Sequence, residues 1–317
     1  MSRILFIFIF LATSFFSTAQ MSISTVAFYN VENMFDTIND PVTDDGDFTP
    51  RGKYRWNAEA YNAKISNIAK VAAMLKADIL GLAEVESSGV LDDLINTKEM
   101  ENYDYVHFDS RDSRGIDVAL LYDVTKVELT EVKPLVYKNG AYNSRDILYV
   151  YCKLNGNPVH ILVCHLPSVN SRAKYRRMAV NSVRYYVNSI AAHDKSAKII
   201  VMGDFNFNPR SKNANALRIG NNGATGLHNP FKQLHDKGYG SYMYRGKWNM
   251  YDMIFVNRNM LTGHGLRYID GSERIFIRDF LIDQSGRFKG YPLRAISNDR
   301  FTGGYSDHLP VYINLAF

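Results

Sequence analysis

The chain has 317 residues, enough for one large domain or two ordinary ones. Hydrophobic residues make up 46% and charged residues 22% of it, which is typical of a folded globular protein and excludes a disordered chain. No repeat or low-complexity tract interrupts it. The net charge of +5 is small for this length and favours an anionic partner, a nucleic acid or an anionic lipid surface, only weakly.

The N-terminus has the pattern of a secretory signal peptide. Arg3 precedes an apolar run from Ile4 to Leu11 that continues to Phe16, and the small residues Ser17 and Ala19 suit a peptidase cut. The run is shorter than the roughly 20 residues of a membrane-spanning helix, so a retained anchor is the less favoured alternative. We expect removal of residues 1–19, a secreted or periplasmic protein without stable membrane insertion, and a single domain over residues 20–317.

The first part of the mature chain predicts strands and one long helix. Residues 23–31 run apolar like a buried strand, and residues 57–76 carry apolar side chains at helical spacing. Further strand patterns follow at 78–84, 103–108 and 116–122.

A predicted hairpin comes next and contains both cysteines. Strand patterns at 127–136, 147–154 and 159–166 include a turn signal, Asn155-Gly156. In that register Cys152 faces Val159 and Cys164 faces Ile147. The two sulfurs would then be too far apart along the ladder to bond. We expect two buried thiols.

The remaining elements are spaced more widely. Residues 172–192 predict an amphipathic helix, and strand patterns follow at 198–202, 250–256 and 309–315. The long Gly-rich and aromatic connections, 206–249 and 257–306, are of the kind that usually carries function. Strand hairpins with only two clear long helices predict an α/β layered fold of two packed mixed β-sheets flanked by helices.

Polar side chains recur where the predicted strands end. Strand ends gathered at one rim of a sheet form a cleft, where α/β folds place their sites. Any single one could be a solvated strand terminus, but the repetition favours a site. The residues are Asn30, Glu32, Glu84, Glu86, His165, Asp204, Asn206, Asp252, Asp307 and His308.

This set of residues favours a hard cation. Glu84, Asp307 and the Asn30 amide offer oxygen ligands, which Mg²⁺ prefers, whereas the Cys and His spacing of a zinc site is absent. Such an ion polarises a phosphoryl oxygen while a carboxylate or imidazole prepares water for attack. The pattern therefore predicts hydrolysis of a phosphate ester.

Six ordered motifs resemble the DNase I-like endonuclease/exonuclease/phosphatase superfamily, over the whole mature chain. They are YNVENMFD at 29–36, LAEVE at 82–86, VCHLPS at 163–168, GDFN at 203–206, YDMIFV at 251–256 and YSDHLPV at 305–311. The resemblance implies a four-layer sandwich, a catalytic domain over residues 20–317 and Mg²⁺-dependent hydrolysis, with Mn²⁺ or Ca²⁺ as alternative ions.

The resemblance also implies roles for the strand-end residues. Asn30, Glu84 and Asp307 would hold the metal, and Asp204 would orient or deprotonate the attacking water. Asn206 would bind the phosphate, and His308, held in its tautomer by Asp252, would stabilise or protonate the phosphoryl oxygens.

Further roles follow from a resemblance to the pancreatic-DNase and sphingomyelinase types, which have a histidine at the motif position that His165 occupies in this chain. His165 would be a second acid/base group or phosphate ligand, with Asp117 as its partner. Arg145 would contact phosphate, unless it is a solvated surface residue. Glu32 and Glu86 are expected behind the metal ligands or at the surface.

The loops decide the substrate within such a superfamily. Their cations and aromatic rings suit a phosphate backbone and its bases, so we expect sequence-tolerant cleavage of nucleic acid, DNA favoured over RNA, by a monomer. A sphingomyelinase-type lipid phosphodiesterase or another phosphoester hydrolase is the alternative, and a catalytically silent binding module is disfavoured because no matched position is lost. The loop residues are Tyr239, Tyr242, Tyr244, Arg245, Lys247, Arg287, Lys289, Arg294 and Arg300.

Overall fold

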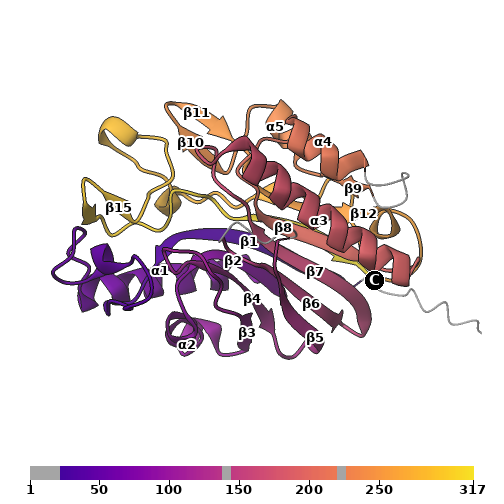
Figure 1. Ribbon diagram of the computed structural model, residues 1–317, viewed down its shortest axis with the longest axis horizontal. Helices are drawn as coiled ribbons and strands as arrows, with labels where there is room; N and C mark the ends of the chain where they lie inside the picture. Colours follow the sequence, from indigo (N-terminus) through magenta and orange to yellow (C-terminus); the bar gives the residue numbers. More distant parts are fainter. Residues whose placement is uncertain (1–21, 138–143, 220–225) are drawn as a thin grey trace, which may run out of the picture.

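The structure is a computed structural model that describes residues 22–137, 144–219 and 226–317. The expected signal peptide, residues 1–19, lies outside the described residues. Two β-sheets pack face to face with helices on their outer faces (Figure 1). None of the described helices combines the length and apolar character needed to cross a membrane.

The first sheet has the strand order β13-β17-β1-β2-β4-β3, with β14 also paired to β17. Strands β1 and β2 are parallel, and β17 and β4 run antiparallel to them. The strands are β1 (Ile23–Met34), β2 (Ile79–Val85), β3 (Tyr103–His107), β4 (Asp117–Asp123), β13 (Arg267–Tyr268), β14 (Arg274–Ile275) and β17 (Val311–Ala316).

The second sheet has the order β5-β6-β7-β8-β12-β9, and only β7 and β8 are parallel. Its strands are β5 (Val127–Leu135), β6 (Ile147–Leu154), β7 (Asn157–His165), β8 (Ile199–Asp204), β9 (Leu227–His228) and β12 (Asp252–Asn257). Mixed pairing in both sheets brings several strand ends to one rim.

Alternation along the strands builds two apolar layers. In β1, Val26 and Phe28 join the core between the sheets, whereas Ala27, Tyr29 and Val31 face the layer covered by α1. At Gly81 in β2 the sheets approach so closely that a Cβ atom would lie 2.6 Å from the Met202 sulfur of β8.

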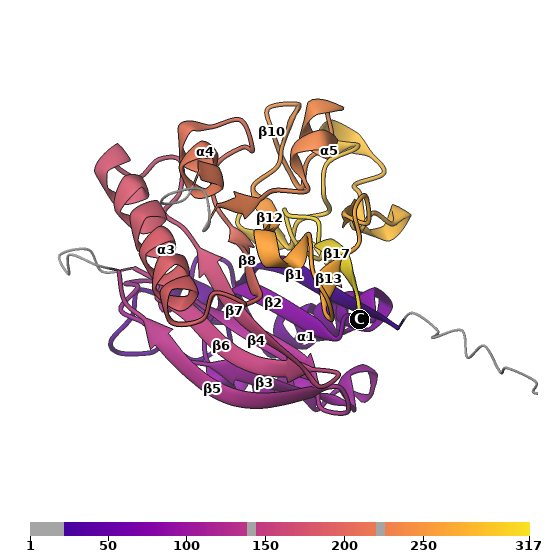
Figure 2. The same cartoon turned by 90° about the vertical axis from the view of Figure 1, so that its right-hand side faces the viewer.

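Helices complete the two outer layers. Figure 2 shows α3 along the outer face of the second sheet, where it buries an apolar stripe. Helices α1 and α2 cover the first sheet (Figure 1). Helix α1 begins where the Asn57 side chain accepts a hydrogen bond from the Ala60 amide at 2.9 Å. The helices are α1 (Ala58–Leu75), α2 (Ser88–Ile95), α3 (Ala173–His193), α4 (Lys212–Ile219) and α5 (Lys232–Asp236).

The long connections hold small elements that gather near one end of the sheets (Figure 1). Two hairpins, β10–β11 and β15–β16, lie there. These strands are β10 (Tyr242–Tyr244), β11 (Lys247–Asn249), β15 (Ile296–Ser297) and β16 (Arg300–Phe301), and 3₁₀ turns span Gly46–Phe48, Lys98–Met100, Arg258–Met260, Asp279–Leu281 and Gly286–Phe288.

The four-layer α/β sandwich predicted from the sequence is confirmed. Every predicted long element is present, with ends that differ by a few residues. Cys152 pairs with Val159 as expected, and both cysteines are free and buried. Helices α2, α4 and α5 were not predicted, because each is short and two lie inside the long connections.

Candidate active site

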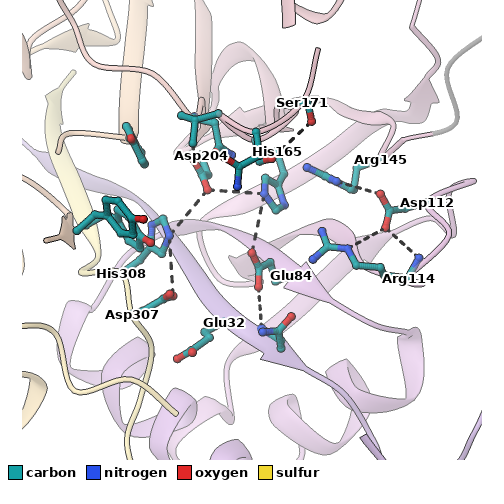
Figure 3. Close-up of a pocket in the computed structure, with 18 of the residues that line it drawn as sticks. Glu32, Glu84, Asp112, Arg114, Arg145, His165, Ser171, Asp204, Asp307 and His308 are labelled. Atoms are coloured by element: carbon teal, nitrogen blue, oxygen red, sulfur yellow. Dashed lines mark hydrogen bonds and ion pairs between the residues drawn. The ribbon is translucent and has the colours of Figure 1, made fainter. Parts of the chain in front are cut away.

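Strand register assembles one half of the site. His165 at the end of β7 pairs with Asp204 at the end of β8, and Asp204 pairs in turn with Asp252 at the start of β12. Three ionisable groups from neighbouring strands therefore meet at one rim of the second sheet. Figure 3 shows two of them, His165 and Asp204, side by side. All three are buried.

Irregular backbone assembles the other half, at the rim of the first sheet. The β1–β2 ladder shifts register after Asn30, and the β2–β4 ladder shifts between Ala83 and Val85, so Glu84 sits in a β-bulge. Glu84 has a φ of 67°, a left-handed conformation that non-glycine residues rarely adopt. A bulge re-aims a side chain, and here it directs Glu84 toward the pocket.

Asp204 lies at the centre of the site. Its Oδ2 accepts a hydrogen bond from Asn30 Nδ2 at 3.2 Å and lies 3.6 Å from His165 Nε2 and 4.0 Å from His308 Nε2. Its Oδ1 accepts from the Asn206 amide at 2.9 Å. Burial, together with the negative charges of Asp252 and Glu84, raises the pKa of Asp204 to about 7, against the opposing effect of His308. A carboxylate with such a pKa can accept a proton near neutral pH.

His308 is held by a buried carboxylate. Its Nδ1 lies 2.6 Å from Asp252 Oδ2, and its Nε2 faces Asp204 and, at 3.9 Å, Asp307. Burial alone would lower the pKa of His308, but Asp252 and the neighbouring acids outweigh it and raise that pKa well above its usual value. These contacts favour the imidazolium form of His308, with Nε2 facing the pocket.

His165 has the opposite electrostatic character. Burial and the nearby Arg145 and Arg114 charges lower its pKa well below the usual value, so the ring is neutral. Its Nε2 lies 3.9 Å from Glu84 Oε1 as well as near Asp204. Asp117 was expected to partner His165, and this prediction is wrong. Asp117 begins β4, and its Oδ2 lies 3.6 Å from His107 Nε2 on the adjacent strand β3.

A cationic wall closes one side of the pocket (Figure 3). The Arg145 guanidinium is buried, with Nη1 2.9 Å from Asp112 Oδ2 and Nη2 donating to the Leu166 carbonyl at 3.2 Å, so it is not a solvated surface residue. Asn206 Nδ2 donates to the same carbonyl at 3.0 Å. Arg114, half exposed and 3.6 Å from Asp112 Oδ1, is a second cation that the motifs did not predict.

A network of charged groups supports the opposite side. Arg294 bridges Glu32 Oε1 at 3.1 Å and Asp307 Oδ2 at 3.0 Å. Lys64 of α1 is completely buried and donates to the Tyr305 carbonyl at 2.5 Å and to the Val31 carbonyl. Glu32 is therefore a buried group beneath the site and not a surface residue.

Glu86 does not line the pocket. It is partly buried, and its Oε2 accepts a hydrogen bond from the Asp36 amide at 2.6 Å. This contact places it behind the rim, as expected.

These residues line an open pocket of about 640 Å³. It brings together the predicted strand-end residues except Glu86 and except Asn30 and Asp252, which support it from behind. The ring of Tyr242, which also borders the pocket, lies 4.8 Å from that of His308. Tyr242 was predicted only as a substrate-binding loop residue, and Tyr251, Asp112 and Arg114 were not predicted at the site; the aromatic loop at 239–251 was the available signal for Tyr251.

The oxygen donors at this rim fit a divalent cation. Carboxylates of Glu84, Asp204 and Asp307 border one pocket, and burial, together with the negative charge of Glu84, raises the pKa of Asp307 as well as that of Asp204. Asn30 Nδ2 donates to Glu84 Oε1 and Asp204 Oδ2, both at 3.2 Å, while its oxygen accepts from the Glu32 amide. In this orientation Asn30 positions two carboxylates, and Glu84 and Asp307 present the exposed oxygens.

The model of the Endonuclease/Exonuclease/phosphatase family matches residues 25–317, nearly the whole chain. The chain belongs to this family. Members of the family hydrolyse phosphoester bonds, generally with a divalent metal, so the chain is an endonuclease/exonuclease/phosphatase-family phosphoesterase. The resemblance of the six motifs is thereby confirmed.

Solved structures of the family share the fold. A family protein from Bacteroides thetaiotaomicron is 17% identical, with a TM-score of 0.61 over 94% of this chain and 99% of that one. A mannosyl-6-phosphatase from the same organism is 17% identical, with a TM-score of 0.58 over 93% and 100%. TDP2 of D. rerio, in complex with a single-strand DNA product, is 16% identical, with a TM-score of 0.60 over 93% and 99%. No curated protein sequence matches the chain.

Lys64 is expected to be required for stability. We predict that Lys64→Met lowers the free energy of unfolding by about 3 kcal/mol, because it leaves Glu32 buried with one cation fewer. The double variant Lys64→Met/Glu32→Gln should recover much of the loss in a urea titration. A double variant no more stable than Lys64→Met would show that lost packing, and not charge, is the cause.

Proposed function

We propose that this family member is a metal-dependent phosphodiesterase that cleaves nucleic acid without sequence preference, DNA in preference to RNA. The chemistry rests on the Asp204-centred site described above. The choice of substrate rests on a second pocket that adjoins the first.

The second pocket carries the substrate proposal. It has a volume of about 460 Å³ and shares Tyr242, Tyr244 and Asp307 with the catalytic pocket, so a chain-like substrate can occupy both. Its walls alternate cations with rings: Arg245 lies 5.2 Å from the Tyr244 ring centre, and Arg287 lies 5.6 Å from that of Phe288. Cations for a phosphate backbone beside rings for stacking bases are typical of single-strand recognition.

A phosphomonoester on a sugar would occupy the first pocket alone. A lipid would need an apolar surface where the second pocket instead presents Arg245, Arg287 and Arg294. The similarity in fold to a protein solved with a single-strand DNA product is compatible with the proposal.

The side chains support in-line attack of water on phosphorus. Asp204 accepts the proton of the attacking water while the bond from phosphorus to the leaving oxygen breaks on the opposite side, and the leaving oxygen takes a proton from solvent. The orientation of Asp204 is held by Asn30 and the Asn206 backbone amide. The imidazolium of His308 donates to a phosphoryl oxygen through Nε2, with Asp252 fixing the tautomer. The other phosphate oxygens contact neutral His165, Asn206 and Arg145 of the cationic wall.

Glu84 and Asp307 would hold the divalent ion, with Asn30 positioning Glu84. Mg²⁺ is the proposed ion, with Mn²⁺ or Ca²⁺ as alternatives, because all the exposed donors are oxygens. Bound there, the ion would offset the charge of the phosphoryl oxygens.

Export and a monomeric state complete the proposal. The signal-like residues 1–19 support a secreted or periplasmic location, where extracellular nucleic acid is available. N-terminal sequencing of the protein from the producing cells would show whether the chain begins near Gln20.

Asp204 and the Asp252–His308 pair should be indispensable for catalysis. We predict that Asp204→Ala and Asp252→Asn each lower kcat for plasmid nicking by roughly 10² to 10⁴, because one loses the proton acceptor and the other the tautomer of His308. The circular dichroism spectrum should stay unchanged. Asp236→Asn, an exposed acid paired with Arg210, is the matched control and should keep full activity. Near-normal nicking by Asp204→Ala at saturating Mg²⁺ would overturn the site assignment.

The second pocket should matter only for long substrates. We predict that Arg245→Ala/Arg287→Ala raises KM for single-stranded DNA about tenfold or more and weakens its salt dependence, since two phosphate contacts are lost. kcat/KM for bis(p-nitrophenyl) phosphate, which fills only the first pocket, should not change.

Lys153→Ala, an exposed cation at the far end of the β6–β7 hairpin, provides the control. Equal losses on both substrates, or none on DNA, would mean that the second pocket does not bind nucleic acid.

A further inference from the structure

The loop between β3 and β4, residues 108–116, forms part of the active-site wall. Its residues Asp112, Ser113 and Arg114 border the catalytic pocket, and Asp112 holds the Arg145 guanidinium. The two ends of the loop are His107, the last residue of β3, and Asp117, the first of β4. What fixes those ends also fixes the wall.

His107, Asp109 and Asp117 form a cluster outside the catalytic pocket. One potential ligand atom from each lies within 4.8 Å of the other two. His107 Nε2 is 3.6 Å from Asp117 Oδ2, whereas Asp109 Oδ1 lies 3.9 Å from Nδ1, the other nitrogen of the ring, and must turn to share an ion at Nε2. The side chains of His107 and Asp117 are only 3% and 5% exposed, whereas that of Asp109 is 87% exposed.

Two atoms of the cluster are unsatisfied. His107 Nε2 and Asp117 Oδ1 are buried and have no hydrogen-bond partner among the described residues. Buried polar atoms without partners are costly and rare in native proteins, so each calls for a ligand. Both belong to the same cluster and come from its two buried members.

The spacing distinguishes an ion from a hydrogen bond. A direct imidazole–carboxylate hydrogen bond would bring the atoms to about 2.7–3.2 Å. Two ligands that share a tetrahedral ion at about 2.0–2.2 Å lie roughly 3.3–3.6 Å apart. The observed 3.6 Å between His107 Nε2 and Asp117 Oδ2 fits the second arrangement. The same distance separates His165 Nε2 from Asp204 Oδ2, so the two unsatisfied buried atoms, and not the distance alone, set the His107 cluster apart.

We propose that His107, Asp109 and Asp117 bind a divalent ion of the zinc class, which clamps the two ends of loop 108–116. One imidazole nitrogen and two carboxylates suit Zn²⁺, with water as the fourth ligand, whereas Mg²⁺ and Ca²⁺ take oxygen ligands almost exclusively. Asp109 is exposed and free to turn toward the ion. The site thus differs in ion preference from the all-oxygen rim at Glu84 and Asp307.

Zinc binding in a large excess of Mg²⁺ tests the proposal. The excess Mg²⁺ is added to fill the oxygen rim at Glu84 and Asp307. The Zn²⁺ that stays bound after dialysis is then measured by elemental analysis, and the melting temperature is measured with and without Zn²⁺. The folded wild type should retain one equivalent of Zn²⁺ and melt at a higher temperature with it. His107→Gln and Asp117→Asn should lose both effects.

His308→Gln is the matched control, because it removes the imidazole of the second His–carboxylate group, which His308 forms with Asp204 and Asp252. It should keep the zinc and the shift. If a buried variant fails to fold, Asp109→Asn, which alters only an exposed carboxylate, should still weaken zinc binding. No zinc on the wild type, or zinc lost from His308→Gln and kept by His107→Gln, would overturn the proposal.

Discussion

The register among β7, β8 and β12 is the constraint on which the catalytic site depends. It places His165, Asp204 and Asp252 side by side at one rim, without any long side chain having to reach across the fold. A shift of one residue in either ladder would turn these groups to the opposite faces of the sheet. The apolar runs that bury β7 and β8 on both faces hold the register, so the core positions the chemistry.

The two sheets contribute different parts of the site. The second sheet supplies Asp204 and Asp252 and, through Asp252, the orientation of His308. The first supplies Glu84, turned toward the pocket by a bulge, and Asn30, whose amide ties Glu84 to Asp204 across the sheet interface. Close packing of the sheets is therefore part of the catalytic geometry.

Ion pairs extend the site into the loops. Arg294, from the long connection 257–306, reaches Glu32 and Asp307 at the rim, and Lys64 lies beneath them in α1. Through Arg294 the loop that forms the second pocket also touches the acid expected to bind metal. Arg294 therefore both lines the proposed substrate pocket and holds the acids of the catalytic site in place.

Sequence patterns predicted the layers, the long elements and the strand-end residues, because period-two and helical spacing report directly on burial. They could not predict the positive φ of Glu84, since a bulge depends on pairing between distant strands. Asp117 was assigned to the wrong histidine for a similar reason: its closeness to His107, which pairs with Ala119 two residues further along β4, depends on contacts between distant parts of the chain. The positions of Arg114 and Arg294 depend on loop conformation, which no periodicity encodes.

The most direct test of the nuclease account is product release from supercoiled plasmid, ribosomal RNA and sphingomyelin liposomes, each with Mg²⁺ and with EDTA. The account predicts Mg²⁺-dependent nicking of plasmid, weaker cleavage of RNA, no release from liposomes and no activity in EDTA. Activity confined to liposomes would keep the fold and the Asp204 site but contradict the nucleic-acid substrate.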